Sequence, residues 1–360
     1  MERSTWTALE RSSSRYNGCM TTAPRRPTIL DVARAAGVSK SLVSIAIRGE
    51  QGVSERTRAH VLEVAGRLGY RSNAWARNLA GGRSGLLGVL LNDLGSGYHT
   101  DVVLGIEEAA DREGLMVVIA NGGRDAHRLG SRLDGLVELG VDGIVVVSGQ
   151  TPREQLTSAA RRVPLVVVGR LSVEGTQAGQ VANDDREGAR LAVLHLASLG
   201  HRRIAHLTAS DRPAAADRRA AHLETLERLG LASAGVFEDD ANGIDALLAA
   251  AREPDGPTAV FTSTDRLAAR LLGRAVDAGL RIPQDLSIVG YDNTDLAASV
   301  RPALTSIDQH RQQLGARAVA QLLERLRGEA APSREVLTPT LIVRASTTTA
   351  TARGDRAAGA

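Results

Sequence analysis

The sequence predicts an α/β protein in which a small helical module precedes a larger region of doubly wound parallel sheet. Two observations carry this prediction. Residues 28–69 contain three short amphipathic patterns separated by breaks that contain glycine. From residue 86 onward, continuous apolar runs alternate with amphipathic segments, which is typical of strands buried on both faces of a parallel sheet. Such folds bind ligands at the carboxyl ends of their strands.

The first two amphipathic patterns predict a helix, a tight turn and a second helix. Thr28 and Asp31 form a capping-box pattern, so the first helix should begin at Ile29. Gly37 can adopt the positive φ of a helix C-terminal turn, and Ser39 can cap the second helix. This is the order of elements in a DNA-binding helix-turn-helix motif, although any αα-hairpin shares it.

A third helix should begin after Ser54 and end at Gly69, with an apolar stripe at Val61, Val64, Ala65 and Leu68. Residues 73–81 then show a helical pattern of one to two turns between an Asn cap and a Gly stop. A helix this short is marginal in water on its own.

Residues 28–81 resemble the lactose-repressor/galactose-repressor (LacI/GalR) family of bacterial transcription regulators, and the resemblance continues to about residue 348. It is carried by Asp-Val-Ala-Arg-Ala-Ala-Gly-Val-Ser at 31–39, Val-Ser-Glu-Arg-Thr-Arg at 53–58, Leu-Gly-Tyr at 68–70 and Asn-Ala-x-Ala-Arg-x-Leu at 73–79. The resemblance implies a hinge helix that folds only on operator DNA, with Leu79 as a wedge in the minor groove. A disordered segment can order on binding, and an apolar wedge can kink a base step.

The resemblance also implies which residues contact DNA: Thr28, Ser39, Lys40, Ser41, Ser44, Ile45, Arg48, Asn73, Ala76 and Leu79. Lys40 is the only lysine of the chain, and Lys and Ser side chains can both donate to base edges. A solvated helix start is the alternative for Lys40. Ile45 and Arg48 depart from the Arg and Asn that the family usually carries. Because Ile45 can contact only a thymine methyl group, the operator sequence is left open.

Charge is distributed unevenly along the chain. Residues 1–85 contain 14 Lys/Arg and 6 Asp/Glu, whereas the remainder contains 30 and 35. A basic head on an acidic body indicates nucleic-acid binding. The single cysteine, Cys19, excludes an intramolecular disulfide and a cysteine metal cluster. No apolar run approaches the roughly 18 residues of a membrane span, and the N-terminus lacks the apolar core of a secretory signal, so we expect a cytoplasmic protein.

The expected segments are a disordered tail at 1–27, a helix-turn-helix domain at 28–72, a hinge helix and linker at 73–82, a two-lobed effector-binding and dimerisation domain at 83–348, and a disordered tail at 349–360. Met1 and Met20 are both possible starts. The resemblance implies two lobes like those of periplasmic sugar-binding proteins. It places the chain crossings between lobes near 183–186, 291–294 and 322.

Within the lobes, the apolar runs predict strands at 86–91, 116–120, 143–147, 165–168, 203–207, 259–262, 286–290 and 337–344. The amphipathic segments predict helices at 102–112, 126–139, 151–161, 186–199, 214–229, 243–251, 266–278 and 309–327.

Candidate effector-binding residues lie after these strands or at helix starts: Tyr98, Arg170, Asp184, Arg218, Phe237, Asp265 and Asp292. Tyr98 and Phe237 are able to stack on a sugar face or a base ring, or to pack in the core. Arg218 stands where family members place an arginine that hydrogen-bonds the effector. Carboxylates such as Asp265 and Asp292 can accept two sugar hydroxyl groups at a strand end, although Asp265 could instead cap the next helix.

Signatures of enzymes are missing from the sequence, which has no G-x-G-x-x-G after a strand, Walker-type loop, G-x-S-x-G elbow or H-E-x-x-H pair. We therefore expect no catalytic residue, metal site or cofactor. The resemblance implies a homodimeric repressor of a near-palindromic operator, since a two-fold dimer needs symmetric half-sites. It favours a sugar as effector, with nucleosides and other small polar metabolites open.

Two alternatives remain at this point. One is a small-molecule sensor with vestigial DNA binding, and the other is an enzyme on the same scaffold. The sequence does not identify the effector, the operator or the regulated genes. It does not distinguish induction from corepression. A dimer is favoured over a tetramer because no long heptad-patterned helix follows residue 345.

Overall fold

The computed structural model describes residues 27–48, 51–70, 83–208, 210–240, 242–329 and 333–350. The chain divides into two compact units, Met1–Gly81 and Gly82–Ala360. No helix in the described ranges is long and apolar enough to cross a membrane.

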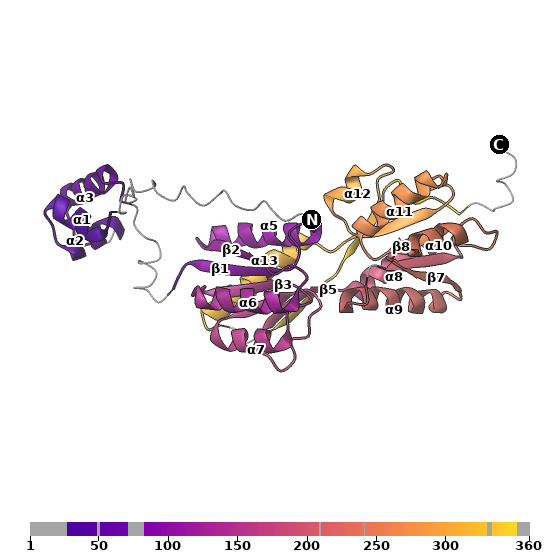
Figure 1. The fold of residues 1–360 in the computed structure, drawn as a ribbon, viewed down its shortest axis with the longest axis horizontal. Helices are drawn as coiled ribbons and strands as arrows, with labels where there is room; N and C mark the ends of the chain where they lie inside the picture. The colour runs from indigo at the N-terminus through magenta and orange to yellow at the C-terminus, as the bar shows by residue number, and fades with distance from the viewer. Residues whose placement is uncertain are drawn as a thin grey trace, which may run out of the picture. The chain divides into compact units, whose positions relative to one another are not determined.

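The described part of the first unit consists of the helices α1 (Ile29–Ala36), α2 (Lys40–Arg48) and α3 (Glu55–Arg67) (Figure 1). The capping box predicted for α1 is confirmed, because the Thr28 amide donates to Asp31 Oδ2 at 2.8 Å and the Thr28 hydroxyl accepts from the Asp31 amide. Gly37 ends α1 with a φ of 67°. Ser39 Oγ accepts from the Leu42 amide at 3.2 Å and so caps α2. Two helices joined by a tight turn follow from these local contacts.

Small apolar side chains fill the space between the helices of the first unit. The buried set is Val32, Ala33, Ala36, Val43, Ala46, Val61, Val64 and Ala65. Leu68, which the sequence placed in the α3 stripe, is 38% exposed. It follows the last residue of α3 as its C-cap, so its side chain leaves the buried face.

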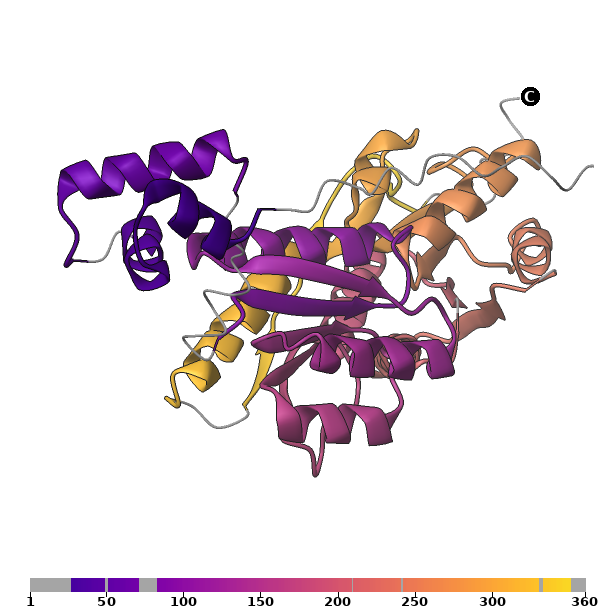
Figure 2. The same cartoon turned by 60° about the vertical axis from the view of Figure 1, so that its left-hand side comes forward.

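The second unit contains two six-stranded sheets, one in each lobe, among the described residues (Figures 1 and 2). The first sheet has the order β11-β5-β4-β3-β1-β2 and is parallel throughout. Its strands are β1 (Leu86–Leu91), β2 (Met116–Asn121), β3 (Gly143–Val147), β4 (Leu165–Val168), β5 (Gly179–Asn183) and β11 (Arg334–Leu337).

The second sheet has the order β12-β10-β9-β8-β6-β7. All of its pairings are parallel except that of β12, which runs antiparallel to β10. Its strands are β6 (Ile204–Thr208), β7 (Ser233–Glu238), β8 (Ala259–Thr262), β9 (Ser287–Asp292), β10 (Thr305–Asp308) and β12 (Thr340–Ile342).

Helices cover both faces of each sheet, which explains why most strands are continuous apolar runs. In the first lobe, α5 (Gly97–Arg112) and α13 (Arg311–Leu326) cover one face, and α6 (Ala126–Glu138) and α7 (Arg153–Arg162) cover the other. In the second lobe, α10 (Gly243–Ala250) and α11 (Asp265–Asp277) cover one face, and α8 (Asp185–Ser198) and α9 (Pro213–Arg228) cover the other. The short helix α12 (Asp295–Ser299) lies alongside.

The chain passes between the lobes at three places in the described ranges. The first crossing lies between β5 and α8, as expected near 183–186. The second lies between β10 and α13, at 308–311 rather than 291–294, because β10 still belongs to the second sheet. The third lies between β11 and β12, at 338–339 rather than near 322. The predicted strand 337–344 therefore contains β12 and only the last residue of β11, and these two strands lie in different sheets.

The elements that sequence patterns missed are β5, β7, β10, α12 and all of β11 except its last residue. Gly-Gln-Val-Ala-Asn in β5 and Thr-Ser-Ile-Asp in β10 contain few large apolar residues, so no apolar run marks them. Strand β7 lies at a sheet edge, and its residues are exposed or half-buried. Helix α5 also begins at Gly97 instead of residue 102. These differences matter because the missed segments lead into the space between the lobes.

Candidate functional site

Two cavities meet between the lobes, where strands of both sheets end. The smaller cavity has a volume of about 240 Å³ and the larger about 580 Å³. Residues that line both are Asn92, Ser96, Tyr98, His99, Ser210, Arg212, Thr264 and Asp292. The smaller cavity is also lined by residues that follow or end β3, β4, β5 and β8, namely Ser148, Gly169, Arg170, Asn183 and Ser263. This is the position that the doubly wound fold predicts for a ligand.

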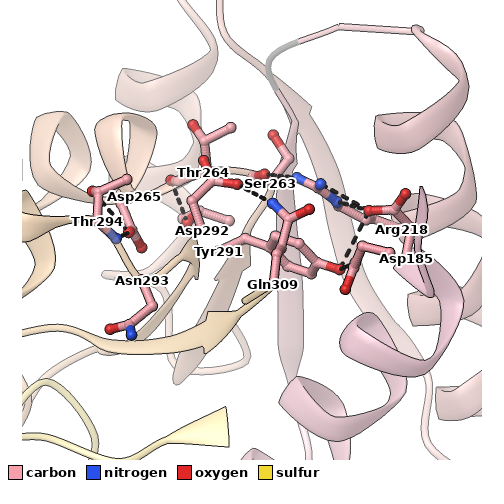
Figure 3. A network of polar contacts seen from close by, with 12 residues as sticks. Asp185, Arg218, Ser263, Thr264, Asp265, Tyr291, Asp292, Asn293, Thr294 and Gln309 are labelled. Carbon is pink, nitrogen blue, oxygen red and sulfur yellow. Dashed lines mark hydrogen bonds and ion pairs between the residues drawn. The ribbon is translucent and has the colours of Figure 1, made fainter. Parts of the chain in front are cut away.

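Arg218 of α9 forms the centre of a buried polar network at the smaller cavity (Figure 3). Its side chain is only 8% exposed. Its Nε and Nη2 atoms each lie 2.8 Å from Asp185 Oδ1, and Nη1 donates to the Ser263 carbonyl at 2.5 Å. Asp292 Oδ1 lies 4.0 Å from Nη1. Two carboxylates and a carbonyl therefore compensate one buried cation, as a desolvated charge requires.

Tyr291 of β9 belongs to this network through its hydroxyl group. Its hydroxyl accepts from Asn183 Nδ2 at 2.7 Å and donates to Asp185 Oδ1 at 3.3 Å. Burial, followed by the negative charge of Asp185, raises the pKa of Tyr291 well above its usual value. Gly188 of α8 leaves room for the hydroxyl, because a Cβ atom there would lie 2.4 Å from Tyr291 Oη. The phenol thus ties β5, α8 and β9 together.

Asp292 ends β9 in an unusual backbone conformation, with a φ of 108°. Its side chain accepts a hydrogen bond from Gln309 Nε2. Burial raises the pKa of Asp292 to about 7, although the positive charges of Arg218 and Arg311 lower it. Positive φ values at non-glycine residues are costly and persist where the surroundings enforce them, often at binding sites. Asp292 is therefore a carboxyl group that titrates near neutral pH at the cavity wall.

Four of the expected effector residues line the smaller cavity: Tyr98, Arg170, Arg218 and Asp292. Tyr98 comes from the first turn of α5, and burial raises the pKa of its hydroxyl. Arg170 follows β4 in the first lobe and forms an ion pair with Asp217 of α9 at 2.5 Å. Because α9 belongs to the second lobe, this ion pair bridges the lobes beside the cavity.

Three expected residues, all of them described, lie outside the linings of both cavities. Asp184 caps α8 by accepting from the Glu187 amide at 3.0 Å. Phe237 packs on the apolar cluster between the second sheet and α10. Asp265 is buried and bonded to other protein groups, and it neither lines the two cavities nor caps α11. The cap of α11 is Thr264, which accepts from the Leu267 amide.

Asp265 instead joins three segments of the second lobe. It accepts from the Thr294 amide at 2.7 Å, from the Thr294 hydroxyl at 3.0 Å and from the Ser306 hydroxyl at 2.5 Å. Burial raises the pKa of Asp265, while these hydrogen bonds lower it. By binding Thr294, Asp265 holds the loop after β9 in place, and this loop begins directly after Asp292.

Several lining residues were not predicted from the sequence, including Asn92, Ser148, Asn183, Asp185 and Gln309. Asn92 and Ser148 directly follow two apolar strands, so the rule that ligands bind at strand ends could have found them. Gln309 follows β10, which the sequence did not reveal. In the described ranges, no group of three His, Cys, Asp or Glu side chains is placed to hold a metal ion.

The start of α2 presents the polar residues expected to contact DNA. Ser39, Lys40 and Ser41 are exposed, and Ser44 and Ile45 are half-buried. Thr28 uses its hydroxyl in the capping box, donating to Asp31 Oδ2 at 2.7 Å. Arg48 is the last residue of α2. Asn73, Ala76 and Leu79 lie outside the described residues.

Comparison with known proteins gives matches at both ends of the chain. A family model for bacterial regulatory proteins of the lacI family matches residues 28–73, and a model for the periplasmic binding protein-like domain matches residues 193–347. Catabolite control protein A of Priestia megaterium is 34% identical over 87% of this chain and 96% of its own length. The similarity to this relative therefore extends over nearly the full length of both chains and includes both of the regions that match family models.

Solved structures agree with this result. The lac repressor dimer bound to operator and the anti-inducer ONPF has a TM-score of 0.80 and 28% identity, covering 90% of this chain and 100% of that chain. A LacI family transcriptional regulator from Enterococcus faecium with bound ribose has a TM-score of 0.66 and 26% identity, covering 74% of this chain and 100% of that chain. With a relative above 30% identity over most of its length, this chain belongs to the lacI family of bacterial regulatory proteins.

Proposed function

We propose that this chain is a transcriptional repressor whose operator affinity is controlled by a small molecule bound between the two lobes. The observation that carries the proposal is the presence, in one chain, of a helix-turn-helix with an exposed polar helix start and a polar cavity walled by both lobes. A binding module alone would not need the first feature, and a DNA-binding module alone would not need the second.

On the DNA side, α2 enters the major groove and Lys40 and Ser41 contact base edges. Further contacts to the DNA come from Thr28, Ser39, Ser44, Ile45 and Arg48. The minor groove is contacted by the hinge residues Asn73, Ala76 and Leu79. A homodimer presents two such helices to a near-palindromic operator, as in the lac repressor dimer bound to operator. This activity places the protein in the cytoplasm with its DNA.

On the effector side, the smaller cavity binds a sugar-sized molecule. Its volume of about 240 Å³ and its polar wall suit one small hydroxylated ligand, and ribose is bound in a related regulator. Arg218 and Asp292 contact the ligand from the second lobe, and Tyr98 and Arg170 from the first. Because the ligand touches both lobes, it favours one arrangement of them over another, and operator must change effector affinity in return.

The first test is selection of bound sequences from a random double-stranded DNA pool by the purified full chain, at two salt concentrations. Enrichment of one palindrome that survives the higher salt would support a sequence-specific repressor. Binding that is unenriched and lost at the higher salt would reflect phosphate contacts alone. That outcome would favour the alternative of a sensor with vestigial DNA binding, which the unusual Ile45 motivates.

A second test separates regulation from catalysis. The selected operator is titrated with protein in the presence of candidate ligands, and each ligand is recovered afterwards. A ligand that changes operator affinity and is recovered unchanged supports the proposal. Recovery of a converted product would support an enzyme on this scaffold instead.

A further inference from the structure

Two buried amide oxygens at the smaller cavity lack a hydrogen-bond donor within the described part of the chain. Asn92 and Asn183 are 4% and 3% exposed, and Oδ1 of each is unpartnered. Their Nδ2 atoms are already used, by Gln150 Oε1 at 3.0 Å and by Tyr291 Oη at 2.7 Å. A buried acceptor without a donor is costly. A ligand with hydroxyl groups would supply the missing donors from inside the cavity.

The opposite wall of the same cavity is the N-terminus of α9. Pro213, Ala214 and Ala215 form its first turn and line the smaller cavity. No side chain caps this helix, and the amides of Ala214 and Ala215 have no acceptor among the described residues. Uncapped amides and the helix dipole together attract a negative group.

Arg212 adds a full positive charge beside these amides. It precedes Pro213 and lines both cavities. Its side chain forms no ion pair or hydrogen bond with any described residue, whereas Arg124 of the same cavity is paired with Asp93 at 3.0 Å. Burial, followed by the nearby charge of Arg124, lowers the pKa of Arg212. Arg212 and Arg124, from different lobes, thus bring two positive charges to the larger cavity, and of these two Arg124 has a carboxylate partner among the described residues.

The carboxylates of the smaller cavity already have protein partners. Asp185 accepts from Arg218 and Tyr291, and Asp292 accepts from Gln309. They therefore leave little demand for a cation in the ligand. Among the described residues, two kinds of cavity group still lack a partner. On one side they are the oxygens of Asn92 and Asn183, and on the other they are the guanidinium of Arg212 and the first amides of α9.

We infer that the effector is a small polyhydroxylated molecule that carries an anionic group, a phosphate or a carboxylate. The anionic group binds the N-terminus of α9 and Arg212, and hydroxyl groups donate to Asn92 and Asn183. A neutral sugar would donate hydrogen bonds to the two asparagines, but Arg212 and the first amides of α9 would then bind only water. This inference rests on the proposed function and specifies the chemical class of its effector.

The test measures ligand affinity of the full chain by isothermal titration calorimetry. The probes are ribose, ribose 5-phosphate, glucose, glucose 6-phosphate and gluconate, so that each anionic probe has a neutral counterpart. The test variant is Arg212→Gln. The control is Arg228→Gln, which removes the same charge from the exposed far end of the same helix. Thermal unfolding checks that both variants fold.

We expect at least one anionic probe to bind about tenfold more tightly than its neutral counterpart, as a charge-assisted contact provides. Arg212→Gln should weaken binding of that anionic probe about tenfold and leave the affinity for neutral sugars unchanged. Arg228→Gln should change neither the affinity for the anionic probe nor that for neutral sugars. A preference for ribose 5-phosphate or glucose 6-phosphate would identify a phosphate, and a preference for gluconate would identify a carboxylate.

Three outcomes would overturn the inference: neutral sugars that bind as tightly as their anionic counterparts, equal losses in the two variants, or no binding of any anionic probe. Operator selection on the same protein keeps the two proposals apart. A selected palindrome without an anion preference would overturn only the effector class. Failure to select any sequence would count against the proposed repressor itself.

Discussion

The guanidinium group of Arg218 stacks on the ring of Tyr291, with Cζ 3.5 Å from the ring centroid. The phenol hydroxyl and the guanidinium then share one acceptor, Asp185 Oδ1. Stacking fixes the plane of the guanidinium, and the shared carboxylate fixes its rotation within that plane. Arg218 is therefore oriented before a ligand arrives, which reduces the entropy lost on binding.

Replacing Arg218 should remove effector binding and lower stability. Arg218→Gln leaves Asp185 buried with its ion pair broken, a change that typically costs about 3–5 kcal/mol. Urea unfolding and ligand titration measure the two effects. The control is Arg219→Gln on the same helix, whose partner Asp211 is largely exposed, so the expected loss is at most about 1 kcal/mol. Similar losses in the two variants would contradict the role of the buried network.

The raised pKa of Asp292 predicts a pH-dependent penalty on stability. A carboxyl group whose pKa is about 7 in the folded state and lower in the unfolded state holds its proton more tightly when folded. The folded state therefore loses stability as pH rises from about 4 to 7, and the penalty is complete above that range. Asp292→Asn removes the titrating group and with it this penalty.

Unfolding free energies at pH 4.5 and pH 8 measure this effect. The variant should gain about 1 kcal/mol or more over the parent protein between the two pH values. Asp295→Asn serves as the control, because Asp295 is an exposed carboxyl three residues further along. A stability difference between the Asp292 variant and the parent that stays constant with pH would show that another group sets the pH dependence.

The ion pair between Arg170 and Asp217 should restrain opening of the lobes. Asp217→Asn removes a half-buried pair that bridges them. Because such pairs contribute up to about 1 kcal/mol, hydrogen exchange of the loop after β4 should accelerate by up to about fivefold. Glu224→Gln is the control, since Glu224 pairs with Arg186 and both belong to the second lobe. If both substitutions accelerate exchange equally, the ion pair with Arg170 does not restrain opening.

Leu79 tests the proposed hinge contact, although it lies outside the described residues. Leu79→Ala should weaken binding to the selected operator far more than binding to random DNA, because an apolar wedge acts only where the base step is kinked. Gel-shift titrations at one salt concentration compare the two DNAs. Equal losses on both would argue against a wedge in the minor groove.

Local chemistry allowed much of the fold to be predicted from the sequence. A capping box, a positive-φ glycine and a serine cap act within a few residues, so the ends of α1 and the start of α2 could be read directly. Strands buried on both faces need continuous apolar runs, and β1, β3 and β4 are such runs. The contiguous motifs at 31–39 and 73–79 likewise indicated the family.

Only the tertiary structure decided which polar residues face the cavity. Asp184 and Asp185 are neighbours in sequence, yet one caps α8 and the other pairs with Arg218. Asp292 ends β9 and Asp265 begins the helix that follows β8, but only Asp292 lies at the cavity wall, because Asp265 is bonded to Ser306 of β10 and to Thr294. The physical reason is that capping is local, whereas the direction of a buried carboxylate depends on donors from segments distant in the chain.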